Sequence, residues 1–576
     1  MKKLICAATL GSVAALSSSV SAFDPATGAD ITIYHAGASA SSSTFFENVV
    51  GLCLDNDNLD VFWDLDSDNA IPDQNNVFAP GTKYEASYWA IACETDSTKI
   101  PGLPGGTTFK MFYSKRDSGG SAVGVYPLAG DLPVAFMKID EGNCPGYAAD
   151  ITAGTREVHE CDYDNRSATN DDDDLQVPNF GSSDVEPALF AAPSNNPQTD
   201  YNNDGTIDDV VAAAGNPSLA PLDLTRRSAG YLGFGIVGNL RLWQALQYDQ
   251  FPSDSVCNPG NASYDASGVN TASNALDCMP SLTKAAVASL MARNRQVDEL
   301  DEILDLANLP AAVNDLDKTN DGAAPLNDLN DNFVEVCRRV EGSGTQAQNN
   351  VYFFNYPCDN TLDGGINTAV PAEEDGIPFF GNGFFELIND KIAENAGSSD
   401  LSRCLNDYQN GTNDSGKNAR GFARAAIGLH STTKSDGLTS DYRFFKIDGV
   451  APTIENMQSG RYQQYFAQSY QTNPGNVNAN QQAVFDTIVD KQNDPVQLGG
   501  FNKVQHYTKV GTADENATKG GWQNIPSATN LPSTSTFAAP IARFPRVDFA
   551  ASVNSCALPT AYPEEDEPID PAPDES

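Results

Sequence analysis

Hydrophobic and polar positions alternate along several segments of the chain and then change to helical spacing. Residues 29–54 pass from period-two alternation to an apolar run with helical spacing, through a turn of small residues, which predicts strand–loop–helix. Residues 106–129 and 333–350 repeat this plan, 231–247 give another strand and helix, and 177–190 give a short strand that ends in a Ser-Ser-Asp turn. Strands that alternate with helices predict an α/β fold with mainly parallel sheets.

The rest of the pattern predicts a helix over 281–294, two strands within 421–452 and a helix over 453–470. Long stretches rich in Asn, Asp, Gly and Pro separate these elements, and we interpret them as surface insertions: 55–105, 145–176, 191–222, 250–275 and 355–420. The final PEEDEPIDPAPDES is acidic and rich in proline, a composition typical of disorder.

The first residues have the pattern of a secretory signal peptide. A basic MKK precedes an apolar stretch too short to span a bilayer, and the small residues VSA stand directly before Phe23. We therefore expect residues 1–22 to be removed and the mature protein to be periplasmic or secreted. No later run is long and apolar enough to cross a membrane, so we expect no membrane insertion.

Cysteine usage fits an exported protein. Of the 11 cysteines, removal of Cys6 leaves ten, and an even number in an exported chain predicts a disulfide framework. The neighbours Cys144–Cys161 and Cys257–Cys278 are the simplest pairs, and the sequence leaves the other pairings open.

The charge of the chain is strongly acidic. The sequence has 34 Lys+Arg against 77 Asp+Glu, a formal net charge of −43. This balance argues against nucleic acid or anionic membranes as partners, because binding to phosphate backbones needs a basic surface. The adjacent pair Arg338–Arg339, directly before Gly-Ser-Gly-Thr, therefore calls for a specific explanation.

Three loops of small residues each follow a predicted strand and open a predicted helix: 37–43, 117–121 and 341–345. A helix N-terminus offers unpaired N–H groups and partial positive charge, and small residues let the backbone approach a ligand. A single such loop is weak evidence, because a serine at a helix N-cap is usually only a cap. Three together with the arginines favour an anion site, and none has the lysine spacing of a Walker loop.

These segments resemble the phosphate-binding proteins of bacterial ABC importers, a branch of the type II periplasmic binding proteins. RVEGSGT (339–345) is similar to that family's Arg-x-Asp-Gly-Ser-Gly-Thr signature, and NFGSSDVEP (179–187) to its Asp-Phe-Gly-Ala-Ser-Asp stretch. GASAS (37–41) and SGG (118–120) match its first two ligand loops in order. FKIDGVAPTIENMQSGRYQQYF (445–466) resembles its returning segment.

The resemblance implies a set of ligand-binding residues: Ser39, Ala40, Ser41, Ser118, Gly119, Asp184, Arg339, Ser343, Gly344 and Thr345. Arg339 would hold the oxyanion with two parallel hydrogen bonds. Asp184 would accept the proton of hydrogen phosphate, and would reject sulfate, which has no proton to donate.

Other roles remain open for the charged residues. Arg339 could form a surface ion pair with Glu341, and Asp184 could be only a turn residue or helix cap. Arg338, Lys115 and Arg116 could be exposed to solvent, or could widen the site toward a larger anion such as a phosphate ester.

The resemblance also implies a two-lobed fold with long loop insertions. After the signal peptide, 23–225 would form the first part of lobe 1, 226–424 lobe 2, and 425–558 the rest of lobe 1, before the tail at 559–576. The expected function is binding of phosphate or a similar oxyanion between the lobes, for import through an ABC permease. The alternative is a secreted or surface-associated structural or adhesion protein on the same scaffold.

A segment within 200–209 has the spacing of a calcium loop. Asp200, Asn202, Asp204 and Asp208 occupy positions one, three, five and nine, but position twelve is Val211 instead of glutamate. We expect at most a structural calcium ion and no other cofactor.

The sequence offers no convincing catalytic set. It has no G-x-S-x-G or H-E-x-x-H motif, and the histidines near the serine loops are His35 and His430. His35 directly precedes the first loop, so a Ser–His arrangement there stays open. We therefore expect a binding protein and not an enzyme, with a phosphoester hydrolase as the least favoured alternative.

Overall fold

The computed structural model describes part of the chain. The described residues are 25, 28–55, 59–64, 87–140, 142–144, 157–161, 173–191, 195, 198–199, 201–202, 208–214, 224–265, 273, 275–292, 300, 303–305, 334–358, 392–419, 421, 423–434, 441–504, 519–523, 542, 555–556 and 559. The predicted signal peptide lies outside them, as does the acidic tail apart from its first residue. Within them, no helix is long and apolar enough to span a membrane.

The strands are β1 (Ile31–Gly37), β2 (Leu59–Asp64), β3 (Tyr88–Asp96), β4 (Thr108–Arg116), β5 (Val134–Met137), β6 (Glu157–Cys161), β7 (Asp173–Gln176), β8 (Phe180–Ser183), β9 (Gln198–Thr199), β10 (Asp208–Asp209), β11 (Thr225–Asn239), β12 (Ser281–Leu282), β13 (Glu335–Arg339), β14 (Ile392–Asn395), β15 (Ala426–Ser431), β16 (Tyr442–Phe444), β17 (Lys446–Ile447), β18 (Tyr465–Thr472), β19 (Lys503–Val504), β20 (Lys519–Gly520) and β21 (Trp522–Gln523).

The α-helices are α1 (Ser42–Val50), α2 (Gly120–Val123), α3 (Tyr126–Gly130), α4 (Val210–Ala213), α5 (Leu240–Gln250), α6 (Lys284–Ala292), α8 (Gly344–Phe354), α10 (Ser398–Asn410), α11 (Ile454–Gln458), α12 (Ala479–Gln492) and α13 (Pro495–Gly500). Short 3-10 helices cover Pro187–Ala191 and Leu276–Cys278.

One mixed sheet of 13 strands organises the molecule, in the order β14-β13-β15-β11-β18-β8-β1-β4-β3-β2-β6, with β16 and β21 also paired to β11. β1 is parallel to both β4 and β8, and β13 is parallel to both β14 and β15. The sheet therefore has two halves, each built around parallel strands. This arrangement confirms the α/β class predicted from the sequence, but the expectation of mainly parallel strands was wrong, because β11 is antiparallel to β15 and β18, β18 to β8, and β3 to both β2 and β4.

The long strand β11 joins the two halves. Its first part, Thr225–Gly233, pairs with β18, and its second part, Phe234–Gly238, pairs with β15. Through β18 the first part reaches β8 and β1, whereas β15 continues to β13. The chain passes between the two halves of the sheet a second time between β16, which pairs with the end of β11, and β18, which pairs with its first part.

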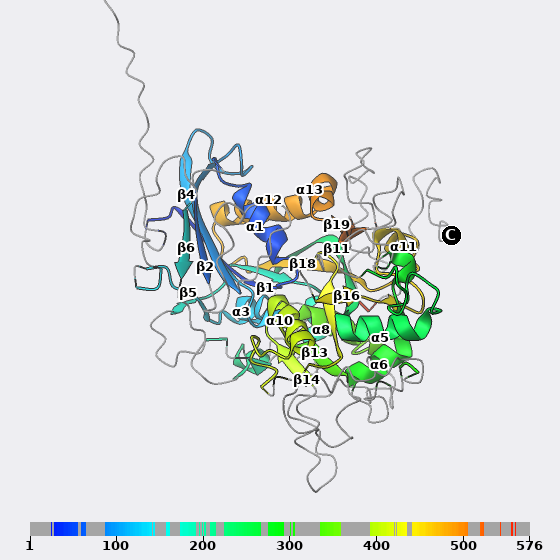
Figure 1. Ribbon diagram of the computed structural model, residues 1–576. Helices are drawn as coiled ribbons and strands as arrows, with labels where there is room; N and C mark the ends of the chain where they lie inside the picture. Colours follow the sequence, from blue (N-terminus) through cyan, green and yellow to red (C-terminus); the bar gives the residue numbers. More distant parts are fainter. Residues whose placement is uncertain are drawn as a thin grey trace, which may run out of the picture.

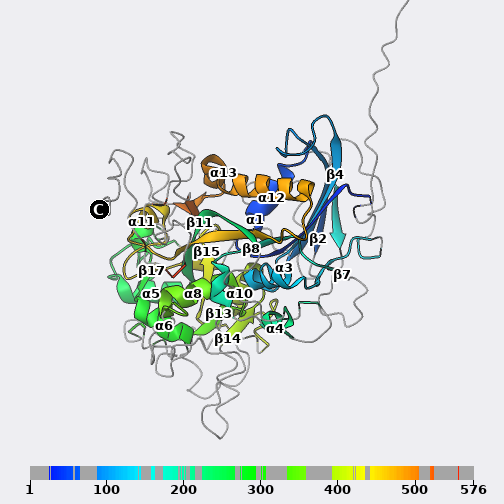
Figure 2. The ribbon, with the colours of Figure 1, turned by 180° about the vertical axis from the view of Figure 1, so that it is seen from behind.

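Helices cover the sheet on separate faces (Figures 1 and 2). α1 and α12 pack against each other, and α12 also contacts β1 and β11. α10 lies against β13, β14 and β15, and α8 contacts β13, β15 and α6. Separate apolar clusters form under α1 and α12, and around β11 with α5 and α6.

Several element predictions were wrong. The helix expected over 453–470 is only the short α11, because Gly460, at φ 69°, ends the turn and the aromatic-rich 465–472 pairs as β18 between β11 and β8. The stretch 55–105, taken as a surface insertion, contributes β2 and β3 to the main sheet, with Trp63 and Trp89 buried. Likewise, 145–176 contributes β6 to the main sheet and contains β7, 191–222 contains β9, β10 and α4, and 355–420 contains β14 and α10.

Five disulfides join all ten cysteines after Cys6: Cys53–Cys93, Cys144–Cys161, Cys257–Cys278, Cys337–Cys404 and Cys358–Cys556. The predicted framework and both neighbouring pairs are confirmed. The other three bonds join cysteines 40 to 198 residues apart, and only the fold could reveal them.

Candidate anion-binding site

The predicted loops meet because they follow strands whose carboxyl ends point the same way within each half of the sheet. The first loop follows β1, the second follows β4, and Asp184 follows β8, and these three strands are parallel neighbours. The third loop follows β13 in the other half. The candidate site therefore draws residues from both halves of the sheet.

The second and third loops are in direct contact. The Ala122 N–H donates to the Gly342 carbonyl at 3.0 Å, and a Cβ on Gly120 would lie 2.9 Å from Ser343 Cα. A Cβ on Gly344 would lie 2.7 Å from Asp184 Cβ. These glycines let the segments approach to distances that side chains would prevent.

Arg339 is buried, with 2% of its surface exposed, and bridges the first and third loops. Its Nη1 donates to Ser39 Oγ and to Ser398 Oγ, both at 3.1 Å. Its Nε and Nη2 donate to the carbonyls of Asn395 and Ala396 at 3.1 and 2.5 Å. This burial excludes the surface ion pair with Glu341 as its role.

Ser398 is a residue that the sequence analysis missed. It opens the 13-residue helix α10, so the N-terminus of that helix meets the arginine side chain. The segment lies in a stretch rich in Asn and Gly that carried no recognised motif. The helical spacing of Leu401, Cys404, Leu405 and Tyr408, all buried, is the signal that could have identified the helix.

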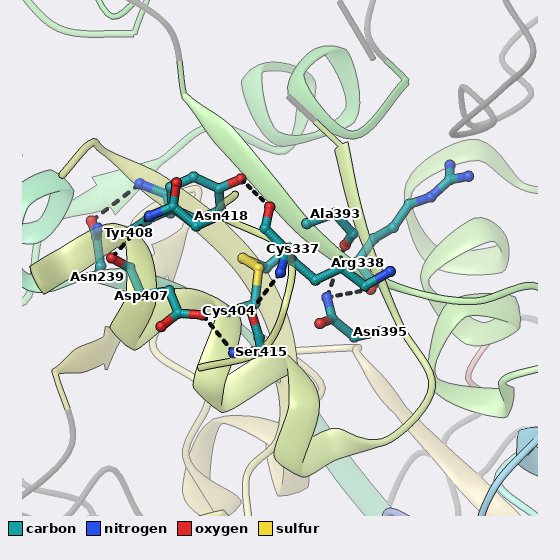
Figure 3. The surroundings of a disulfide bond; sticks show 12 residues. Asn239, Cys337, Arg338, Ala393, Asn395, Cys404, Asp407, Tyr408, Ser415 and Asn418 are labelled. Carbon is teal, nitrogen blue, oxygen red and sulfur yellow. Dashed lines mark hydrogen bonds between the residues drawn. A yellow bond between two sulfur atoms is a disulfide. The ribbon is translucent and has the colours of Figure 1, made fainter. Parts of the chain in front are cut away.

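The Cys337–Cys404 disulfide fastens β13 to α10 close to Arg339 (Figure 3). Beside it, the Asn395 amide donates to the carbonyls of Arg338 and Ala393 at 3.0 and 2.8 Å. The strand that carries Arg339 and the helix that carries Ser398 are thus held together by a covalent bond and a buried amide.

We expect the double variant Cys337→Ala/Cys404→Ala to lose stability and to bind anions more weakly. Removal of such a bond costs about 2–4 kcal/mol of unfolding free energy. Without the bond, Arg339 should be held less firmly against Ser398. Binding should then weaken roughly three- to tenfold, because the anion has to order the arginine side chain when it binds, and ordering one side chain costs free energy of that size. Urea unfolding and calorimetric titration with phosphate measure the two effects.

The matched control is Cys257→Ala/Cys278→Ala, which removes a disulfide between the segment after α5 and the segment before α6. It should lower stability while leaving anion affinity unchanged. Equal affinities in both double variants would contradict the positioning role of the Cys337–Cys404 bond.

Asp184 is a buried acid, 1% exposed. Its Oδ2 accepts a hydrogen bond from Thr345 Oγ1 at 3.3 Å, and its N–H donates to Ser121 Oγ at 3.0 Å. Burial raises the pKa of its carboxyl to about 6, although Arg339, Thr345 and Lys115 act in the opposite direction. Asp184 is therefore more than a surface turn residue.

Several buried polar atoms near these loops have no hydrogen-bond partner among the described residues, and three of them belong to the predicted binding residues: Ser41 Oγ, Asp184 Oδ1 and Ser343 Oγ. Ser41 lies on the loop that contacts Arg339, and Ser343 precedes α8 without capping it through its side chain. Buried polar groups are normally paired, so unpartnered atoms in one region indicate a site for a polar ligand.

The second loop contributes less than expected. Ser118 is partly exposed and its carbonyl accepts from Arg116 Nε at 3.1 Å. Gly119 has φ 81°, and the helix that follows, α2, has only four residues. The loop therefore supplies a tight turn and a contact with the third loop. Ala40, which stands between Ser39 and Ser41 in the sequence, is buried and offers only its backbone.

The other basic residues have structural partners. Lys115 donates to Asp117 Oδ1 at 2.5 Å and to the Gly37 carbonyl at 3.0 Å. Arg116 donates to the carbonyls of Ala135 and Tyr201, and Arg338 pairs with Glu394. None of the three is a solvent-exposed cation, and none of these contacts points to a widened site.

His35 is held in the core below the first loop. Its Nδ1 lies 2.6 Å from Tyr113 Oη and its Nε2 lies 2.8 Å from Ser182 Oγ, while its ring stacks on Phe180. Burial, with Lys115 nearby, places its pKa well below the usual value, so the ring is neutral. It therefore does not pair with the serines of the first loop.

The calcium-loop prediction falls largely outside the described residues, which include Asn202 and Asp208 but neither Asp200 nor Asp204. β9 and β10 pair across the predicted loop, with Thr199 opposite Asp208. Elsewhere in the described part of the chain, no cluster of three or more His, Cys, Asp or Glu residues suits a metal ion. Calcium binding stays a prediction.

Comparisons with known proteins add little to this geometry. No family model matches the chain, and no curated protein matches it. Among solved structures, a candidate phosphate ABC transporter substrate-binding protein with bound phosphate from Clostridium perfringens is 13% identical over 58% of this chain and 81% of its own, with a TM-score of 0.26.

An ABC-type phosphate transport receptor from Vibrio cholerae is 11% identical, over 46% of this chain and 66% of its own, with a TM-score of 0.23. A candidate phosphate-binding protein from Planctomyces limnophilus DSM 3776 is 10% identical, over 64% of this chain and 83% of its own, with a TM-score of 0.24. These values are too low to assign a family or a ligand, so the conclusions below rest on the contacts of this chain.

Proposed function

We propose that the chain binds a small tetrahedral oxyanion, phosphate or a close relative, among the loops that follow β1, β8 and β13. The observation that carries the proposal is the set of unpartnered buried atoms of Ser41, Asp184 and Ser343 beside the buried guanidinium of Arg339. Phosphate oxygens would accept from the two hydroxyls and from the one N–H group on Nη2 of Arg339 that its contacts with Asn395, Ala396, Ser39 and Ser398 do not use, so a single hydrogen bond replaces the expected pair of parallel ones. A phosphate hydroxyl would donate to Asp184.

The electrostatics of this region suit an anion even though the whole chain is acidic. α1 and α8 begin at the first and third loops, and their first N–H groups have no partner within the helix. These helix ends and Arg339 supply local positive potential, which acts more strongly on a buried anion than distant surface carboxylates do.

Asp184 gives the proposed site its selectivity. A protonated oxyanion offers the hydrogen bond that Asp184 Oδ1 lacks, whereas sulfate would place an unpaired, negatively charged oxygen against it. The site therefore favours phosphate over sulfate at neutral pH. Binding breaks no bond in this proposal, and delivery of the anion to an ABC permease is its physiological extension.

Closure around the anion would involve the two halves of the sheet. The chain crosses between them in β11 and before β18, which are natural hinge positions. Since β15 pairs with β13, we infer that the second lobe extends past 425 and that the first lobe resumes near β18.

The experiment is calorimetric titration of the ligand-stripped full mature chain with phosphate, sulfate and a phosphomonoester at pH 7.5. The proposal predicts micromolar or tighter binding of phosphate and no detectable binding of sulfate. Binding of the ester alone would point to a larger ligand. Absence of binding for all three would refute the proposal and favour a scaffold role for a secreted protein.

A further inference from the structure

Gln468 lies beside Asp184 on the neighbouring strand. The pairing of β18 with β8 places Ser469 opposite Ser183, so Gln468 follows next to Asp184. Its Nε2 donates to the main-chain carbonyl of Asp184 at 3.4 Å, and its side chain is 0% exposed. Gln468 is therefore fully buried against the acid of the proposed site.

The orientation of this amide leaves its oxygen unpaired. If the amide were turned round, Oε1 would face the Asp184 carbonyl oxygen, an unfavourable contact between two acceptors. With Nε2 on the carbonyl, Gln468 Oε1 has no donor among the described residues. Asp184 Oδ1 also lacks a donor. Two buried acceptors on adjacent residues thus both require protons from elsewhere.

The possible forms of the ligand differ in the number of protons they can donate. Dihydrogen phosphate carries two P–O–H groups, hydrogen phosphate carries one, and sulfate carries none. We propose that Gln468 is a second proton-accepting contact of the anion site and that the site selects the doubly protonated monoanion, H₂PO₄⁻. This inference rests on the proposed function and specifies its ligand.

The charges around these two residues agree with a monoanion. The ionisable groups near Asp184 are Arg339, Lys115, Asp117 and Tyr470. Lys115 and Asp117 are paired at 2.5 Å, and burial raises the pKa of Tyr470 well above its ordinary value, so its phenol is uncharged. Arg339 and ionised Asp184 then balance each other. A dianion would bury twice the excess charge that a monoanion does.

The test is the pH dependence of phosphate affinity in the wild type, Gln468→Met and Gln468→Glu, measured by calorimetry from pH 5.5 to 8.5. Wild-type affinity for total phosphate should be greatest between pH 6 and 7. Above neutral pH it should fall about tenfold per unit as H₂PO₄⁻ loses its second proton. Below pH 6 it should decline because Asp184 itself becomes protonated.

Gln468→Met removes the acceptor at nearly constant size. Loss of one hydrogen bond to a charged ligand should weaken binding about tenfold at pH 6.5. The decline above neutral pH should flatten, because the dianion no longer faces an unpaired oxygen. Gln468→Glu keeps an acceptor but replaces the Nε2 donor with a second carboxyl group beside Asp184. Its affinity should therefore fall at least as steeply above neutral pH as that of the wild type, and a shallower fall would count against the inference if the methionine variant fails to fold by circular dichroism.

The control is Gln492→Met on α12, where another buried amide has neither atom hydrogen-bonded among the described residues. It should leave the pH profile unchanged. Parallel profiles for the wild type and Gln468→Met would overturn this inference but leave phosphate binding intact. No phosphate binding at any pH would instead refute the proposed function, and this inference with it.

Discussion

Arg339→Ala is expected to abolish measurable phosphate binding at ordinary titration concentrations. Truncating one partner of a buried charged contact costs about 2–5 kcal/mol, which corresponds to roughly 30- to several-thousand-fold in affinity. The loss exceeds that of one contact, because Arg339 also orders Ser39 and Ser398 through Nη1. Calorimetric titration with phosphate at pH 7 measures the change.

The adjacent arginine provides a matched control. Arg338 pairs with Glu394, which is partly exposed, and its side chain makes no contact with Ser39 or Ser398 among those described. Arg338→Ala should therefore lower the free energy of unfolding. It should leave phosphate affinity within about twofold of the wild type, which is the usual error of a prediction made from one lost contact. Arg339→Lys should bind phosphate more weakly than the wild type, because an ammonium group lacks the fixed planar set of N–H donors of a guanidinium group. Equal affinities for Arg338→Ala and Arg339→Ala would contradict the site.

Asp184→Asn should stabilise the ligand-free protein at alkaline pH. The folded-state pKa of about 6 lies above the ordinary value of 3.8, so protonated Asp184 stabilises the fold at low pH and this contribution is lost as pH rises through 6. At pH 8 the ionised acid then costs about 3 kcal/mol, from a shift of about two pKa units. The amide avoids that cost.

Urea unfolding in anion-free buffer at pH 8 and pH 5 tests this expectation. The gain should be largest at pH 8 and smaller at pH 5. Asp486→Asn, an exposed acid paired with Arg227, should change stability by less than about 1 kcal/mol at either pH. If Asp184→Asn is less stable than the wild type at pH 8, the prediction is wrong. That result would show that favourable interactions in the ligand-free site offset the cost of burying the ionised carboxylate.

The same substitution should change anion selectivity. The amide that replaces the carboxyl could donate to an oxyanion, so Asp184→Asn should bind sulfate with little pH dependence between pH 5 and 8. In the wild type, sulfate can bind only when Asp184 is protonated, and its affinity should fall about tenfold per unit above pH 6. A flat sulfate profile in the wild type would remove Asp184 from the selectivity argument.

The local motifs of the site could be predicted from the sequence. Arg339, Gly344 and Thr345 lie within seven consecutive residues, and the strand-to-helix pattern around them places the loop at the end of a strand. Asp184 follows a short buried strand in the same way. These features depend only on residues that are close together in the sequence. Hydrophobic spacing and turn residues predict such local structure directly.

Contacts between distant segments could not be predicted. Ser398 reaches Arg339 only because β14 pairs with β13 and directs the chain into α10. Gln468 reaches Asp184 only because 465–472 is a strand, whereas its spacing also suited the helix that we expected. β2 and β3 were hidden between polar stretches, and their place in the sheet depends on pairing with β4. Tertiary pairing decided each of these cases.

Two of the disulfides have overlapping spans along the chain. Cys337–Cys404 encloses Cys358, and Cys358–Cys556 encloses Cys404, so residues 337–556 form one connected covalent ring system. A protease that cuts once anywhere inside this span leaves every fragment attached. In an oxidising medium, the strand that carries Arg339 and the strand that carries Gln468 would stay in one molecule after such a cut. Nicked protein should then run as separate fragments only on a reducing gel, and it should keep its capacity to bind until the bonds are reduced.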